Sequence, residues 1–213
     1  MKKVYVILSM SVLCFSSCKK DGKTDAENAK VADSVKTAEA IAEQPLDSAA
    51  QEKAWIAYAT PGASHKMMAD ETGTWKCEMT FWMEPNGKPQ KASSTAVSKM
   101  ILGGRYQESS YKGMMMGQPF EGKSTLAYNN ANKEYTTTFI DNMGTGMIVA
   151  TGTYDEKSKS INFKGDMVNP FNGKKSPYRE IYTIVDATTR KMEMFEVKKG
   201  QEYKSMEILM KKQ

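Results

Sequence analysis

The sequence predicts an all-β protein: an antiparallel, up-and-down barrel of about ten strands, preceded by a short helical lead-in. Three observations lead to this prediction. Short segments from Gly73 onward alternate apolar and polar residues, turn residues separate them at nearly regular intervals, and no helical spacing interrupts them. None of the connections is long enough for a parallel crossover, so successive strands are expected to pair antiparallel.

The first expected strand shows the alternation most clearly. Residues 74–83 place Trp75, Cys77, Met79 and Phe81 on one face and polar residues on the other, the pattern of a half-buried strand. An Asn-Gly pair, which tolerates the positive φ of a tight turn, follows this strand. The remaining strands are expected at residues 90–102, 105–112, 120–128, 134–141, 146–154, 160–168, 177–185, 191–198 and 202–211.

Closure of the sheet follows from its edges. An open sheet of this many strands would leave two long unpaired edges, and a barrel removes both. The alternative is a two-sheet sandwich, but the simple sequential order of the strands favours the barrel. A barrel of more than eight strands can also leave space inside.

The lead-in, residues 51–73, has helical spacing that is interrupted at Thr60-Pro61. We expect two short helices, with Thr60 capping the second and Pro61 in its first turn. Their apolar stripes are expected to cover part of the domain, at one end of the barrel. His65, the single histidine, is expected to cap or pack within this segment.

The N-terminus has the pattern of an exported lipoprotein. Residues 1–17 combine two lysines, a short apolar stretch and two small serines, as in a cleaved signal peptide. The segment ending at Cys18 resembles the bacterial lipobox, in which the cysteine carries lipid. Phe15 departs from the common leucine, and the alternative is an ordinary secretory signal with an incidental Cys18. Lipidation would anchor the protein to the outer membrane, facing the periplasm or the cell surface.

Residues 18–49 are expected to be the lipidated cysteine and a disordered tether, because they carry no aromatic and few large apolar residues. Such a chain reaches roughly 30 Å. The folded domain is therefore expected to span residues 50–213 and to stand clear of the lipid headgroups.

Charge and residue counts exclude several classes of function. The net charge of +5 is scattered, without the basic and aromatic clusters of nucleic-acid-binding proteins. Cys77 is the one cysteine after residue 18, so no disulfide can form within the domain; it is expected to pack as a small buried hydrophobe. The single histidine precedes every strand that could carry a nucleophile, so no Ser-His-Asp order can be built. We expect no catalytic residue, cofactor or metal, and favour a non-enzymatic protein.

Three features leave alternatives open. Met114 to Met116, between glycines, form either a lid over the barrel mouth, a contact surface, or a connection that folds back on the barrel. Met192 and Met194 lie on one strand face and could bind Cu(I), although cavity lining is the simpler interpretation. If Arg105 or Arg179 points inward, it needs a carboxylate partner or an anionic ligand.

Longer motifs indicate a family. The segments GTWKCEMTFWMEPNGKP, MILGGRYQESSYKGMMMGQPFEG, AYNNANKEYTTTFIDNMGTGM and GTYDEKSKSINFKGDMVNPFNGKK resemble the domain of unknown function 1579 family over about residues 52–211. The resemblance implies a lipocalin-like, calycin-type barrel and brings no assigned activity. A calycin relative, nitrobindin, ligates haem through a histidine near its C-terminal strands; no histidine follows His65 here.

Two functions remain at this level. The first is an envelope lipoprotein whose barrel binds a small apolar or amphipathic ligand. The second is an envelope structural or interaction protein with a filled barrel and no ligand. For the first, the expected ligand-binding residues are Trp75, Met79, Phe81, Arg105, Tyr111, Met115, Phe120, Tyr128, Met147 and Arg179.

Overall fold

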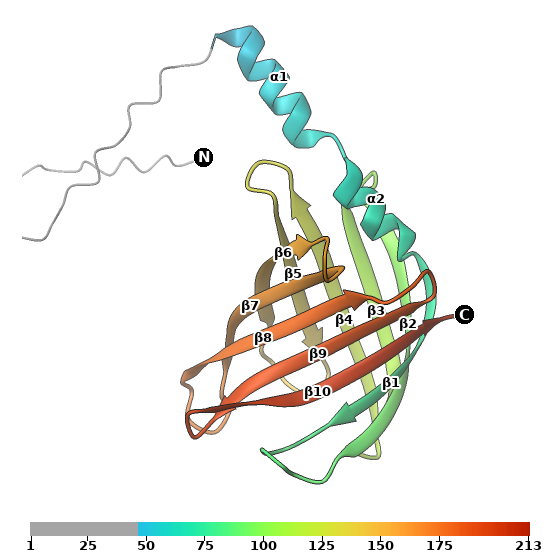
Figure 1. Ribbon diagram of the computed structural model, residues 1–213, viewed down its shortest axis with the longest axis vertical. Helices are drawn as coiled ribbons and strands as arrows, with labels where there is room; N and C mark the ends of the chain where they lie inside the picture. The colour runs from blue at the N-terminus through green and yellow to red at the C-terminus, as the bar shows by residue number, and fades with distance from the viewer. Residues whose placement is uncertain (1–46) are drawn as a thin grey trace, which may run out of the picture. The chain divides into compact units, whose positions relative to one another are not determined.

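A computed structural model describes residues 47–213, which form a closed antiparallel barrel preceded by two helices (Figure 1). The expected barrel is confirmed, and the sandwich alternative is wrong. The elements are α1 (Ser48–Ala59), α2 (Ala63–Asp70), β1 (Gly73–Phe81), β2 (Gln90–Ile101), β3 (Tyr106–Met115), β4 (Gln118–Asn129), β5 (Glu134–Asp141), β6 (Ile148–Asp155), β7 (Ser160–Val168), β8 (Lys175–Ile184), β9 (Thr189–Lys198) and β10 (Gln201–Lys212).

The barrel closes because its first and last strands pair. The register between β1 and β10 runs from Trp75 opposite Lys212 to Phe81 opposite Met206 without a break. All the remaining pairs join strands that are neighbours in sequence, so the order around the barrel is the order of the chain. No strand of the described barrel is left as an edge, which removes the template for pairing with another chain.

The alternation expected from the sequence sorts the side chains into an apolar inside and a polar outside. Trp75, Cys77, Met79 and Phe81 of β1 are all buried, whereas the residues between them carry charge or hydroxyl groups. Cys77 is a free thiol within this buried face, as expected. The same rule holds in β7, where Ile161 and Phe163 are buried and Asn162 is exposed.

Glycine allows close approach of neighbouring strands, as Gly113 and Gly152 illustrate. A Cβ on Gly113 would lie 2.3 Å from the carbonyl oxygen of Ser93, and a Cβ on Gly152 would lie 2.2 Å from that of Asn162. Both distances are far below van der Waals contact. These positions require glycine because a neighbouring strand occupies the space of any side chain.

Helix α2 covers one end of the barrel and contacts β2, β3 and β4 (Figure 1). Its buried face carries His65 and Met68. His65 accepts a hydrogen bond at Nδ1 from the backbone N–H of Gly62, the N-cap residue, at 3.1 Å, and its ring meets the ring of Tyr128 edge-on. The expected capping and packing role of His65 is therefore confirmed.

Three expectations for the lead-in are wrong. Thr60 does not cap α2 but ends α1, where its hydroxyl donates to the carbonyl of Ile56. Pro61 likewise is not the first residue of α2, because it precedes Gly62, the N-cap. Helix α1 buries no side chain, and Trp55 is 67% exposed, because its large apolar residues do not fall on one stripe. Its last carbonyls instead accept hydrogen bonds from two barrel turns, through Asn130 and Arg105.

The described residues begin just before α1. Asp47 caps this helix by accepting from the backbone N–H of Ala50, so residues 47–49, expected to end the tether, belong to the helical lead-in. The expected signal peptide, the lipidated Cys18 and the rest of the tether, residues 1–46, lie outside the described residues. Within residues 47–213, neither helix is long and apolar enough to cross a bilayer.

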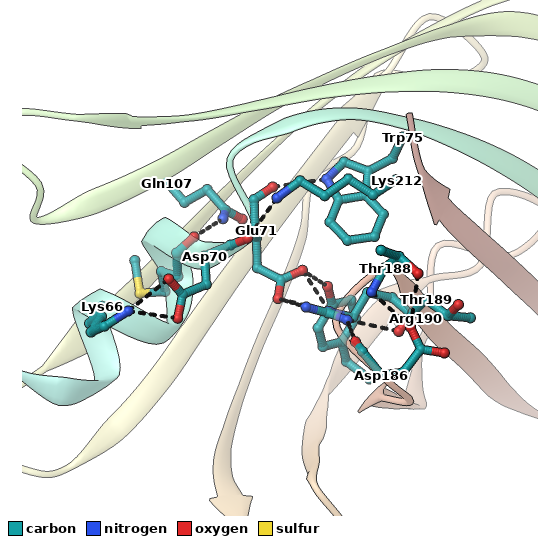
Figure 2. Close-up of polar contacts among 12 residues, drawn as sticks. Lys66, Asp70, Glu71, Trp75, Gln107, Asp186, Thr188, Thr189, Arg190 and Lys212 are labelled. Atoms are coloured by element: carbon teal, nitrogen blue, oxygen red, sulfur yellow. Dashed lines mark hydrogen bonds and ion pairs between the residues drawn. The ribbon is translucent and has the colours of Figure 1, made fainter.

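A buried ion pair joins α2 to the far wall of the barrel (Figure 2). Glu71, the residue that ends α2, receives three N–H···O contacts from the Arg190 guanidinium at 2.7–2.9 Å, and both side chains are buried. Tyr182 donates a further hydrogen bond to Glu71 Oε2 at 2.7 Å. Arg190 also donates to the backbone carbonyls of Asp186 and Thr189.

The free carbonyls at the end of α2 are satisfied by the barrel rather than by water. Gln107 donates to Met68 O at 2.6 Å, Lys212 to Asp70 O at 2.9 Å, and Trp75 Nε1 to Glu71 O at 2.8 Å. The last turn of any helix leaves such acceptors open. Three strands thus fix the position of the helix end by hydrogen bonds as well as by packing.

Breaking the buried pair from one side should destabilise the protein strongly. Arg190→Met leaves the Glu71 charge buried without its cation, which costs about 3–5 kcal/mol of unfolding free energy. Replacing both partners in Glu71→Leu/Arg190→Met should recover part of that loss, because no charge is left buried. Urea unfolding followed by circular dichroism measures both values.

The matched control is the exposed pair Lys66–Asp70 on the same helix. Lys66→Met should cost less than about 1 kcal/mol, as surface pairs do. An Arg190→Met variant as stable as Lys66→Met would contradict the structural role given to the buried pair.

Candidate functional site

The two ends of the barrel differ. One end carries α2 and the turns that follow β2, β4, β6 and β8; the other carries the turns that follow β1, β3, β5, β7 and β9. No helix of the described chain contacts this second end. A cavity lies inside the barrel and reaches that end, so we take it as the candidate site.

The cavity has a volume of about 270 Å³. Its wall is mostly apolar, and thioethers are its most frequent group. Aromatic and aliphatic walls come from Phe120, Phe139, Ile148 and Ile208. The methionines that line it are Met79, Met115, Met116, Met143, Met192, Met194, Met206 and Met210.

A second, smaller hollow of about 80 Å³ lies toward α2. Met68 and Glu71 from α2 and Trp75 from β1 line it. The two hollows share several wall residues, so they are neighbouring parts of one barrel interior. The shared residues are Tyr111, Ser124, Thr137, Glu180, Met192 and Met210.

Glu180 is the acid between the two hollows. It lies on the inner face of β8 and is 7% exposed. The Tyr178 hydroxyl donates to its Oε2 at 2.6 Å, and no residue of the described chain donates to Oε1. Serine and tyrosine hydroxyls lie in the same wall, where Tyr111 and Ser124 share a hydrogen bond at 3.2 Å.

Burial raises the pKa of Glu180 to about 6, and the hydrogen bond from Tyr178 only partly offsets this effect. Burial likewise raises the pKa of Tyr178 and of Tyr111, so both phenols stay neutral. Near neutral pH the site therefore contains a carboxylate in an apolar enclosure. Such a charge costs free energy unless a partner stabilises it.

The raised pKa makes stability depend on pH. Because the folded state holds the Glu180 proton more tightly than the unfolded chain, with its ordinary pKa of 4.5, the benefit is complete below pH 4.5. It is lost as pH rises through about 6, at a cost of about 2 kcal/mol. Glu180→Gln should therefore be more stable than the native protein at about pH 8 and similar to it near pH 4.

Urea unfolding across this pH range measures the difference. Glu121→Gln serves as control, because Glu121 lies next to buried Phe120 on the outer, exposed face of β4. The pH profile of Glu180→Gln should differ from that of the native protein, whereas the profile of Glu121→Gln should follow it. Parallel pH profiles for native protein and Glu180→Gln would contradict the burial of an ionising carboxyl.

The methionine-rich turn lies at the mouth of the cavity. β3 continues through Met115, and Met116 and Gly117 form a two-residue turn with positive φ angles of 51° and 76° before β4 begins. Met115 and Met116 line the cavity, whereas Met114 points outward and is exposed. The segment is therefore a tight connection between two strands, in which Met115 and Met116 turn toward the cavity while Met114 and Met116 are more than half exposed.

Other apolar side chains are exposed on the loops at the same end. Phe171, between β7 and β8, is 95% exposed, and Met83, Met143 and Met147 are also largely exposed. These residues come from three different loops around the mouth. Exposed apolar side chains therefore lie at the same end of the barrel as the mouth of the cavity.

Most of the aromatic and methionine residues predicted to bind a ligand lie inside the barrel. Met79, Tyr111, Met115 and Phe120 line the larger cavity, and Trp75 lines the smaller one. Phe81 is buried at the end of β1 without lining either hollow. Tyr128 packs against Tyr135 and His65 below α2.

Three more predicted site residues, besides Phe81 and Tyr128, line neither interior hollow, and these three lie in turns or on the outer face. Arg105 is in the turn before β3 and donates to Ala59 O, so it does not share the inner face of Gln107, Ser109 and Tyr111. Arg179 is on the outer face of β8, over the Phe195 ring and paired with Glu202 at 2.8 Å. Met147 is exposed in the loop before β6. The inward arginine that closes the barrel with a carboxylate is Arg190.

Sequence reasoning missed the acid inside the barrel. Tyr178, Glu180 and Tyr182 alternate on β8 and form its inner face. The two tyrosines were the available signal for that face, but the glutamate between them suggested the outer one. Glu71 was missed as well, because its partner Arg190 is 119 residues away in sequence.

Two further findings limit the chemistry. Within residues 47–213 no three His, Cys, Asp or Glu side chains lie close enough to hold a metal ion. Burial raises the pKa of the Cys77 thiol, which disfavours the nucleophilic thiolate.

A third hollow, about 370 Å³, is a surface groove between α1 and the barrel, lined by Tyr58, Tyr106 and Tyr128 among others.

Comparison with known proteins agrees with the fold. The crystal structure of Rv2717c from M. tuberculosis superposes with a TM-score of 0.55 at 13% identity, covering 72% of this chain and 99% of that one. At this identity the likeness shows the fold alone. A search of curated proteins gives no significant match. The family model described as protein of unknown function (DUF1579) matches residues 60–212, which span the whole barrel and α2. The chain therefore belongs to the DUF1579 family.

Proposed function

We propose that this protein is a lipid-anchored envelope protein whose barrel binds a small apolar or amphipathic molecule. The observation that carries the proposal is the cavity of about 270 Å³ at the uncovered end of the barrel. A barrel evolved only as a scaffold gains stability from filling such a space, because each unfilled volume forfeits packing. The exposed apolar rim supports entry of an apolar molecule at this end.

The size of the cavity restricts the ligand. It lies just below the usual range of about 300–1,000 Å³ for small-molecule pockets. At roughly 30 Å³ for each water-sized group, it holds about nine such groups. The ligand is therefore a short chain or a single substituted ring, much smaller than a membrane phospholipid.

The methionine wall suits a ligand of variable shape. Thioether side chains are flexible and polarisable, so they adapt to irregular apolar molecules. Burial of an apolar ligand removes its surface from water at about 25 cal/mol per Å². The filled-barrel alternative finds less support, because the space that it requires to be filled is open and continuous with the mouth.

Filling the cavity should abolish binding. Met194→Trp adds a large ring to the cavity wall on β9, so the affinity for a small uncharged fluorescent probe such as naphthalene should fall by roughly tenfold or more. Met114→Trp is the matched control, because Met114 is exposed on the outer face of β3. Fluorescence titration measures both affinities, and thermal unfolding checks that both variants fold.

Equal probe affinity in the two variants would remove the cavity as the binding site. Absence of probe binding to the native protein, together with no change in melting temperature on adding small apolar molecules, would favour the filled-barrel alternative.

The lipid anchor is tested separately. In cells, Cys18→Ser should lose the added acyl mass and leave the membrane fraction, whereas Cys14→Ser should keep both. The measurement is mass spectrometry of the N-terminal peptide after membrane fractionation. An N-terminal peptide of the native protein without acyl mass would overturn the lipid anchor and leave the binding function of the barrel to its own test.

A further inference from the structure

The cavity has a chemical polarity that its apolar walls do not explain. Glu180 is the carboxylate at the boundary of the two hollows, deep in the barrel, while the other end of the larger cavity opens among methionines. Oε2 of this carboxylate accepts from Tyr178, and Oε1 accepts from none of residues 47–213. The mostly apolar cavity therefore contains one carboxylate oxygen, Oε1 of Glu180, that accepts no hydrogen bond from these residues.

No cation within the described barrel compensates this acid. Neither hollow has a lysine, arginine or histidine in its wall. The nearest buried guanidinium, that of Arg190, is already engaged with Glu71, Asp186 and Thr189. A buried acid without a cationic partner is normally costly. Its presence beside an open cavity therefore points to a cationic group that the ligand supplies.

None of the other groups that face the hollows in the described barrel carries a positive charge. Burial raises the pKa of Tyr111, Tyr178 and Tyr182, and of Cys77, so these four remain neutral at pH 8. The remaining acids are Glu71, bound to Arg190 in the smaller hollow, and Asp141, at the end of β5 in the larger one. Every formal charge in the two walls is negative.

We infer that the barrel selects amphipathic amines: a short apolar chain or ring fills the methionine-lined cavity, and its ammonium group donates a hydrogen bond to Glu180. This assignment rests on the proposed ligand-binding function and specifies its ligand class. A carboxylate ligand is repelled by the same acid. An alcohol can donate one hydrogen bond but leaves the charge of Glu180 uncompensated.

The test compares three ligands of eight carbons each that differ in the head group. Octylamine, octan-1-ol and octanoate have nine or ten heavy atoms, close to the room for about nine water-sized groups. Isothermal titration calorimetry at about pH 8, where Glu180 is ionised, should give an octylamine affinity roughly tenfold or more above that of octan-1-ol, with octanoate weakest. At about pH 5, where Glu180 holds its proton and the amine stays charged, this preference should shrink toward unity.

Two variants test whether Glu180 causes the preference for the amine. Glu180→Gln keeps the shape and the acceptor for Tyr178 but removes the charge, so the amine preference at about pH 8 should fall to less than threefold. Glu121→Gln removes an exposed acid from the outer face of β4 and should leave the preference as it is in the native protein. Urea unfolding confirms that both variants are folded.

The outcomes separate the two proposals. If the three ligands bind equally, or if the amine preference survives in Glu180→Gln, the amine assignment is overturned while the ligand-binding function stands. If none of the three binds and none displaces the apolar probe, both the assignment and the proposed function are overturned.

Discussion

The pairing of β1 with β10 is the constraint on which the rest of this structure depends. It joins residues at opposite ends of the folded sequence, Trp75 with Lys212 and Phe81 with Met206. This closure converts a sequential meander into an enclosure, so that one face of every strand looks inward. Without it, the same inward residues would form an apolar sheet face exposed to water, and no cavity would exist.

Closure alone does not make a site, because a barrel has two ends. Helix α2 closes one end, and it does so with hydrogen bonds and a buried ion pair rather than with apolar packing alone (Figure 2). The contacts between Glu71 and Arg190 hold the end of the helix against the barrel. The opposite end carries the longer connections, those between β1 and β2, β5 and β6, and β7 and β8, and methionines line its opening. A fixed closed end and an adaptable open end together give the cavity its direction, with Glu180 at its base.

The sequence allowed prediction of the fold but only part of the site. Strand period and turn residues placed all ten strands within about three residues of their observed bounds, because both are local signals. The inward phase of β1 followed from four apolar residues at alternate positions. In β8 the phase was ambiguous, because Glu180 lies inside and Ile181 does not, and a buried acid reverses the usual rule. Arg105 was misplaced because alternation was extended one residue past the start of β3, into a turn.

Interactions between distant segments were beyond local reasoning. Glu71 and Arg190 are joined only after the barrel has closed, so no spacing in the chain announces them. Likewise, the sequence could show that a barrel of about ten strands has room inside, but not whether side chains fill it. That depended on where methionines, rather than larger aromatic residues, met in the interior.

The hollow itself is the central claim, and a crystal structure under xenon pressure tests it most directly. Xenon enters dry apolar cavities and is visible as strong electron density. We expect xenon among Met79, Met194 and Ile208, in a cavity whose walls keep their positions. An interior in which these side chains have closed together, with no xenon between them, would contradict the account and leave a solid barrel.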